Sequence, residues 1–152
     1  MDRDENELVA KIRGLAPELI EAYMATDYIA HLPSGECTIR IPEDVPLALE
    51  NLVEQEGANS WAFISACNPY SQELPVEENN SRQDLLKRLL DFNGISYFSA
   101  DGQSADGSWK EPSLLALGMS LEMAKSMGTA FGQNAILYGE LGGVVEVVFC
   151  DR

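Results

Sequence analysis

The chain has 152 residues, 45% of them apolar, which is enough to bury the core of one globular domain. Its 10 Lys and Arg residues against 25 Asp and Glu residues give a formal net charge of −15. This charge argues against direct nucleic acid binding, since affinity for a phosphate backbone comes largely from Lys and Arg. No stretch approaches the roughly 20 apolar residues of a membrane span.

Residues 1–14 form a charged leader, and residues 15–152 are expected to form a single domain. The leader has neither the basic start nor the apolar stretch of a signal peptide, so we expect a cytoplasmic location. Cys37, Cys67 and Cys150 contain no C-x-x-C pair, in keeping with a reducing compartment. His31 is the only histidine, so zinc sites and histidine-dependent nucleophiles would all rest on one residue. We therefore expect no metal and no other cofactor.

In chain order, the patterns predict a helix at 17–25, strands at 27–31 and 37–41, and a helix at 45–56 capped by Asp44. A buried strand at 60–67 and a helix at 76–92 follow. Further strands are expected at 95–99 and 113–117, separated by a polar loop at 101–108. Ser120 caps a fourth helix, and Ala135–Gly139 with Val144–Phe149 form a C-terminal antiparallel hairpin.

This order of elements predicts an α+β fold. We expect one mixed sheet of about six to seven strands, with three to four helices packed on it. Trp61–Ala66 should be a central strand because of its apolar continuity.

Unusual polar residues sit where apolar segments end. Asn68 follows the strand at 60–67, and Glu111 and Ser113 lie between Trp109 and an apolar strand. Gln133 and Asn134 lie between the fourth helix and the next strand. A core alone does not require such residues at these junctions, so they indicate one shared site.

The helix at 76–92 connects two of these junctions. Asn79, Arg82, Leu86 and Leu89 fall on one helical stripe, and the two leucines should face the sheet. Asn79 and Arg82 then continue the stripe to the helix N-terminus, close to Asn68. An arginine beside a helix N-terminus favours an anion. Alternatively, Arg82 pairs with an acidic surface neighbour such as Glu78 or Asp84.

Glu111 is the best single candidate for chemistry. A partly buried carboxylate has a raised pKa unless it is paired, and a raised pKa suits a general acid or base. We expect Arg82 and Glu111 to be near neighbours, because two charges carried toward a core are usually paired. Alternatively, Glu111 has a structural pairing or is an exposed loop acid. The amides of Asn68, Gln133 and Asn134 either satisfy nearby backbone groups or bind a ligand.

Several short motifs follow one another along the chain: Ala25–Tyr28, Ile39–Ile41, Trp61–Ile64, Asn68, Pro69, Ser71, Glu78, Asn79, Arg82, Trp109, Glu111–Ser113 and Phe131–Ala135. As an ordered set they resemble a bacterial family of unknown function, number 3293. The resemblance covers roughly residues 17–149 and implies a small stand-alone bacterial domain without an assigned activity.

These observations favour a domain that binds a polar, anionic small molecule or nucleotide at strand ends. The alternative is an acidic adaptor or inhibitor of a basic protein, with Glu43, Asp44, Glu50, Glu54 and Glu56 around its second helix. No membrane contact is expected, and no enzyme class is assigned. The candidate catalytic residue is Glu111, and the candidate ligand-binding residues are Arg40, Asn68, Asn79, Arg82, Ser113, Gln133 and Asn134.

Overall fold

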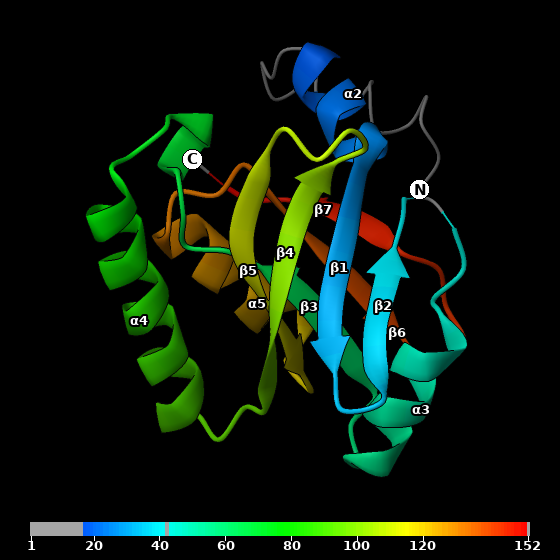
Figure 1. The fold of residues 1–152 in the computed structure, drawn as a ribbon. Coiled ribbons are helices and arrows are strands. Elements are labelled where there is room, and N and C mark those ends of the chain that lie inside the picture. Colours follow the sequence, from blue (N-terminus) through cyan, green and yellow to red (C-terminus); the bar gives the residue numbers. More distant parts are fainter. Residues whose placement is uncertain (1–16, 42, 152) are drawn as a thin grey trace.

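One curled antiparallel sheet of seven strands organises the molecule (Figure 1). The structure is a computed structural model that describes residues 17–41 and 43–151, so the predicted leader lies outside the described residues. The strand order is β2-β1-β4-β5-β3-β6-β7. The strands are β1 (Thr26–Leu32), β2 (Gly35–Ile39), β3 (Ser60–Ile64), β4 (Tyr97–Ser104), β5 (Lys110–Leu117), β6 (Ala135–Glu140) and β7 (Glu146–Phe149).

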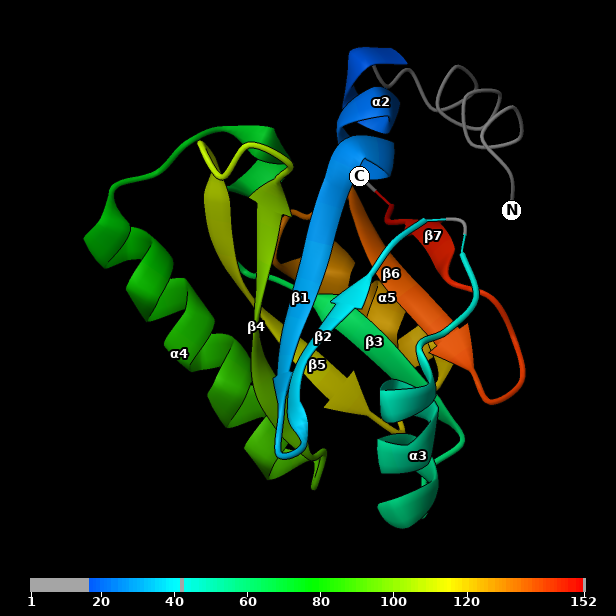
Figure 2. The ribbon, with the colours of Figure 1, turned by 45° about the vertical axis from the view of Figure 1, so that its right-hand side comes forward.

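Within the described residues, four α-helices and one short 3-10 helix precede or connect these strands. The α-helices are α2 (Pro17–Ala25), α3 (Leu47–Gln55), α4 (Val76–Phe92) and α5 (Leu121–Ala130), and the 3-10 helix is η1 (Pro69–Ser71). Figure 2 shows α3 and α4 on opposite sides of the sheet.

Each face of the sheet packs a separate core, because alternate residues of a strand point to opposite faces. Trp61 and Phe63 of β3 join Leu115 of β5 under α3. Ala62 and Ile64 point the other way, into a core closed by α4 and α5. This two-sided burial explains why β3 is apolar from Trp61 to Ile64, and all five of its residues are buried.

The α+β prediction is confirmed, and so are the hairpin of β6 and β7 and the interior position of β3. The predicted mixed sheet is corrected, since every strand pair of the described residues is antiparallel. Helical crossovers return the chain to this sheet without producing a parallel neighbour. The predicted polar loop at 101–108 is also shorter than expected, because β4 continues to Ser104 and β5 starts at Lys110.

Two details of the helices differ from the prediction. Asp44 does not cap α3, whose N-cap residue is Pro46. Asp44 instead forms an isolated antiparallel β-bridge with Val144. The buried stripe of α4 consists of Gln83, Leu86 and Leu90, whereas Leu89 is 37% exposed. The stripe is rotated by one residue because Gln83 takes a buried polar position that a purely apolar pattern does not reveal.

Candidate functional site

The loop after β3 has an unusual backbone. Asn68, Tyr70 and Ser71 have φ values of 48°, 55° and 60°, the left-handed region that side chains other than glycine disfavour. Each such residue costs on the order of 1–3 kcal/mol and persists only where its surroundings enforce it. Strain of this kind clusters at functional sites. The loop Asn68–Ser71 is therefore a starting point for a site.

A reciprocal amide pair joins this loop to the first turns of α4. The Asn68 backbone N–H donates to Asn79 Oδ1 at 2.9 Å, and Asn79 Nδ2 donates to Asn68 Oδ1 at 2.8 Å. The Leu74 N–H also donates to Asn68 Oδ1, at 3.0 Å. Two donors on Oδ1 fix the orientation of the Asn68 amide. Its Nδ2 is thereby directed at Glu111.

Glu111 receives that amide. Asn68 Nδ2 donates to Glu111 Oε1 at 3.1 Å. Burial raises the pKa of Glu111 from 4.5 to about 7, against the smaller, lowering effect of the Asn68 hydrogen bond. Within residues 17–41 and 43–151, no side chain or backbone group donates to the other carboxyl oxygen, Oε2. A carboxyl group in this state exchanges protons near neutral pH and still has a free acceptor.

Arg82 and Gln133 hold the end of β3 to the end of α5. The guanidinium donates from Nε to the Ala66 carbonyl at 2.6 Å and from Nη2 to the Phe131 carbonyl, and it also lies over the Phe131 ring. Gln133 Nε2 donates to the Cys67 carbonyl at 2.9 Å. Asn134 Nδ2 donates to the Ser71 hydroxyl at 3.0 Å. These three side chains support the strained loop through hydrogen bonds.

The predicted direct contact between Arg82 and Glu111 is wrong. In the described part of the chain neither residue forms a salt bridge, and Glu111 is bonded to Asn68 instead. Both charges do act on the thiol of Cys67. Burial first of all raises the pKa of Cys67; Glu111 raises it further, and Arg82 lowers it. Arg82 donates hydrogen bonds to two backbone carbonyls, and these acceptors take the place of a carboxylate partner.

The other two predicted residues contribute less to this network. The Ser113 hydroxyl donates to the Glu111 backbone carbonyl at 3.3 Å. Arg40 follows β2 at the edge of the sheet and pairs with Asp27 at 2.9 Å. The structure thus brings Asn68, Asn79 and Glu111 together, with Arg82, Gln133 and Asn134 as their support, and leaves Arg40 apart. These six side chains form the strand-end network, and the candidate strand-end site is the region around Glu111.

A family comparison matches the same part of the chain. The model of a family described as a protein of unknown function, DUF3293, matches residues 64–136. Residues 64–136 are therefore similar to this family. The match confirms the predicted resemblance over a shorter range than 17–149. The DUF3293 segment runs from the end of β3 to the start of β6 and contains every residue of the strand-end network, but not Arg40.

No curated protein and no solved structure matches the chain significantly. Among the described residues, no helix has the length and apolar character needed to cross a membrane. The DUF3293 segment therefore brings no activity with it, and function must be argued from the site itself.

Sequence reasoning missed two polar residues of the DUF3293 segment. Gln83 is 7% exposed, and its Oε1 accepts the Ala66 N–H at 2.9 Å. Ser65 donates to the Pro112 carbonyl at 2.8 Å and accepts the Cys67 N–H. The sequence signals that could have indicated them are the position of Gln83 next to Arg82 and the position of Ser65 within an otherwise apolar segment. Both residues satisfy backbone groups where β3 ends.

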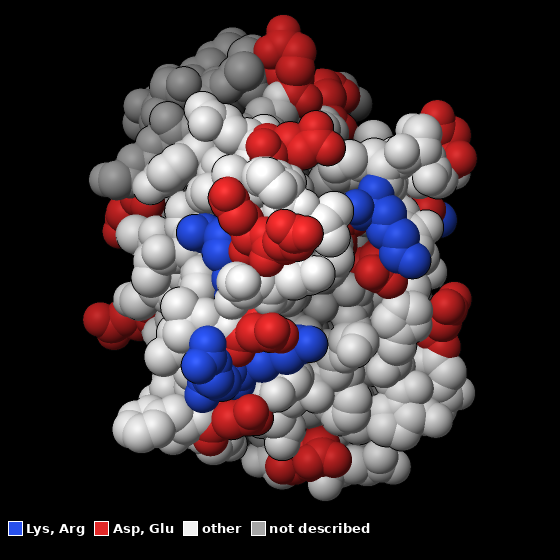
Figure 3. All heavy atoms as spheres, turned by 60° about the vertical axis from the view of Figure 1, so that its left-hand side comes forward, with Lys and Arg blue, Asp and Glu red and all other residues white. Residues whose placement is uncertain are grey.

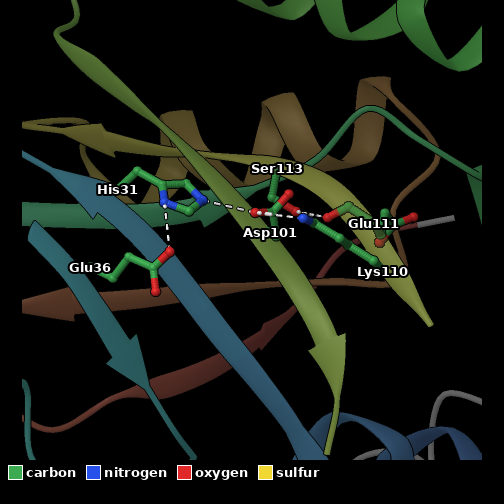
Figure 4. Close-up of polar contacts among 6 residues, drawn as sticks. All are labelled: His31, Glu36, Asp101, Lys110, Glu111 and Ser113. Atoms are coloured by element: carbon green, nitrogen blue, oxygen red, sulfur yellow. Dashed lines mark hydrogen bonds and ion pairs between the residues drawn. The ribbon is translucent and has the colours of Figure 1, made fainter. Parts of the chain in front are cut away.

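A second polar cluster lies on the half of the sheet that includes β1 and β4 (Figure 4). His31 Nε2 lies 2.8 Å from Asp101 Oδ2, and Lys110 Nζ lies 3.8 Å from the same oxygen. Lys110 and Glu111 are consecutive in β5, so their side chains leave opposite faces of the sheet. This cluster is therefore separate from Glu111. Among the described residues, no group of three or more His, Cys, Asp or Glu side chains is arranged to hold a metal ion.

Two open crevices lie at the opposite end of the sheet from Glu111. Their volumes are about 500 and 510 Å³, and both are lined in part by Gly94, Ile95 and Ser96. The second also includes Ser60 and Leu117, which are the first residue of β3 and the last of β5. Neither crevice contains a predicted site residue. The candidate site is therefore identified by the chemistry of Glu111 and not by the volume of a crevice.

A substitution at Gly132 tests how tightly the loop Asn68–Ser71 is packed. Its φ is +70°, and an added Cβ would lie 2.8 Å from Pro69 Cβ. We expect Gly132→Ala to cost about 2 kcal/mol, from backbone strain and overpacking together. Gly142→Ala is the matched control, because its φ is +77° but nothing lies within 4 Å of the added Cβ. Urea unfolding should show a smaller loss for the control; equal losses would mean that Gly132 does not position the loop.

Proposed function

We propose that this domain binds a polar small molecule at the strand-end site, with Glu111 as the group that hydrogen-bonds it. The observation that carries the proposal is the state of Glu111. Its carboxyl is largely buried, one oxygen is oriented by Asn68, and the other has no protein donor within the described residues. A carboxyl whose pKa is raised by burial, and whose second oxygen no described protein group binds, is suited to a ligand.

The surroundings of Glu111 also support a binding role. Three strained residues follow β3, and amides from α4 and from the segment after α5 hold them in place. A protein that needed only a packed core here could end the strand with an ordinary turn. Holding Asn68 in one orientation instead makes the geometry at Glu111 reproducible, which is what a binding site requires.

The charges favour a neutral or cationic ligand over an anionic one. Arg82 is engaged with backbone carbonyls and Arg40 with Asp27, so neither arginine is poised to hold an anion beside Glu111. The net charge of −15 also repels anions. The anionic part of the sequence-based expectation therefore has less support than the polar part.

A thermal-shift screen tests the proposal. The panel comprises nucleosides, nucleotides and phosphorylated metabolites, each applied to the wild type, to Glu111→Gln and to Glu122→Gln. Glu122 is an exposed acid of α5 and is the matched control. A ligand at 100 times its dissociation constant adds about 2.7 kcal/mol of stability. We expect that shift in the wild type and the control, and its loss in Glu111→Gln.

Two results would contradict the proposal. The first is a full panel without any shift in the wild type. The second is a ligand whose shift survives unchanged in Glu111→Gln, because that ligand binds elsewhere.

The acidic adaptor remains the second candidate, favoured by the exposure of Glu43, Asp44, Glu54 and Glu56 around α3. On the face shown in Figure 3, Lys and Arg are interspersed with Asp and Glu, without a continuous basic patch. An electrostatically guided partner should bind more weakly as salt rises. Pull-downs at low and high salt test this, and equal recovery at both would reject the adaptor.

A further inference from the structure

An exposed tryptophan lies beside Glu111. Trp109 is 45% exposed, whereas the other tryptophan, Trp61, is 1% exposed. Two carbons of the six-membered ring of Trp109 lie 3.6 and 3.7 Å from the position that a Cβ would take on Gly102. One edge of the ring therefore lies against Gly102, and nearly half of the Trp109 surface is exposed to solvent.

The sheet register places the ring and the carboxyl next to each other. Gly102 of β4 is the cross-strand partner of Glu111. Trp109 and Glu111 are two residues apart along an extended chain, so their side chains leave the same face of the sheet. The Trp109 ring at Gly102 and the side chain of the Gly102 partner Glu111 therefore lie on the same face of the sheet.

We propose that the ligand of the strand-end site is a neutral planar nitrogen heterocycle, of the nucleobase type, that stacks on Trp109 and donates an N–H to Glu111 Oε2. This inference rests on the proposed function and names the class of ligand for the same site. Every nucleobase has a flat π surface, and stacking on an aromatic side chain strengthens binding substantially.

The chemistry of Glu111 favours a heterocycle over other stacking ligands. With a pKa of about 7, the carboxyl is protonated about half of the time at neutral pH. It can therefore accept a hydrogen bond on one oxygen and donate from the other. The edges of nucleobases carry N–H donors next to carbonyl or ring-nitrogen acceptors, which match both states.

The same charges predict that a phosphate group weakens binding. With Arg82 engaged by the Ala66 and Phe131 carbonyls, the strand-end network has no cation directed at an added phosphate. The net charge of −15 repels it. A nucleoside should therefore bind more tightly than its 5′-monophosphate, and the difference should shrink as salt rises.

Calorimetric and fluorescence titrations test the inference. The probes are adenosine, guanosine and cytidine, guanosine 5′-monophosphate, and ribose 5-phosphate as a probe without a ring system. We expect at least one nucleoside to quench Trp109 emission and to bind, with about tenfold or greater loss of affinity in Trp109→Leu and in Glu111→Gln. Phe92→Leu is the matched control, because Phe92 is an aromatic residue that is 89% exposed on α4.

The outcomes separate this inference from the proposed function. If ribose 5-phosphate binds in a Glu111-dependent way and no nucleoside does, the site stands and the heterocycle is wrong. If a nucleoside binds equally well to Trp109→Leu and the wild type, stacking is wrong. If no probe binds the wild type, the heterocycle is rejected, whereas the proposed function is rejected only if the full thermal-shift panel also gives no shift. Cooperative thermal unfolding establishes that the variants are folded, with a midpoint for Glu111→Gln at or above that of the wild type.

Discussion

Replacing Arg82 with methionine should destabilise the fold by about 3 kcal/mol. The guanidinium donates to the Ala66 and Phe131 carbonyls, and a hydrogen bond that involves a charged group contributes about 1.5–3 kcal/mol. Methionine keeps the length of the side chain but leaves both carbonyls without this donor. Urea unfolding at pH 7 measures the change. The loss should appear in the midpoint without a change in the slope, since the folded core remains.

Arg88→Met is the matched control for this prediction. Arg88 lies on the same helix but is exposed, and substitutions of exposed residues usually change stability by less than about 0.5 kcal/mol. Arg82→Lys should fall between the two variants, because one ammonium group does not reproduce the planar fork of the guanidinium. Equal unfolding midpoints for Arg82→Met and Arg88→Met would show that Arg82 does not join β3 to α5.

Replacing Glu111 with glutamine should stabilise the protein at pH 8 by about 3 kcal/mol and change little at pH 4. Burial raises the pKa of Glu111 from 4.5 to about 7, and each pH unit corresponds to roughly 1.4 kcal/mol. Because the folded state holds this proton more tightly than the unfolded state, wild-type stability falls as pH rises from about 4.5 to 7. Glutamine cannot ionise, and its amide oxygen can still accept the Asn68 hydrogen bond.

The control for the pH series is Glu122→Gln, an exposed acid whose curve should follow that of the wild type. Unfolding by urea from pH 4 to 8 gives all three curves. A constant difference between wild type and Glu111→Gln across this range would mean that Glu111 ionises normally. A less stable Glu111→Gln at pH 8 would mean that its charged form is stabilised by a partner.

Much of the fold could be predicted because its signals are local. The helix at 76–92 has the same bounds in the structure, since Pro75 precedes it and Asn93-Gly94 ends it. Ser120 caps α5 as predicted, with its hydroxyl accepting the Met123 N–H. The hairpin of β6 and β7 follows from its Gly-Gly turn. The relative direction of neighbouring strands depends on the whole topology. Local sequence signals therefore did not reveal that the sheet is antiparallel rather than mixed.

The sequence predicted which residues come together in the site, but not which hydrogen bonds they form. Asn68, Asn79 and Glu111 do come together, because the N-terminus of α4 lies at the end of β3. The expected bond from Arg82 to Glu111 failed because backbone carbonyls compete for an arginine as effectively as a carboxylate does, and their positions are not visible in a sequence. The register that sets Trp109 beside Gly102 and Glu111 is likewise a property of the folded sheet.

The central claim is that Glu111 carries a carboxyl group poised near neutrality with one oxygen open to a ligand. An NMR titration of the side-chain carboxyl carbons, with the Glu111 signal assigned by its absence from Glu111→Gln, measures this most directly. We expect a midpoint close to pH 7, because burial outweighs the hydrogen bond from Asn68. A midpoint close to 4.5, the ordinary value for glutamate, would contradict the account.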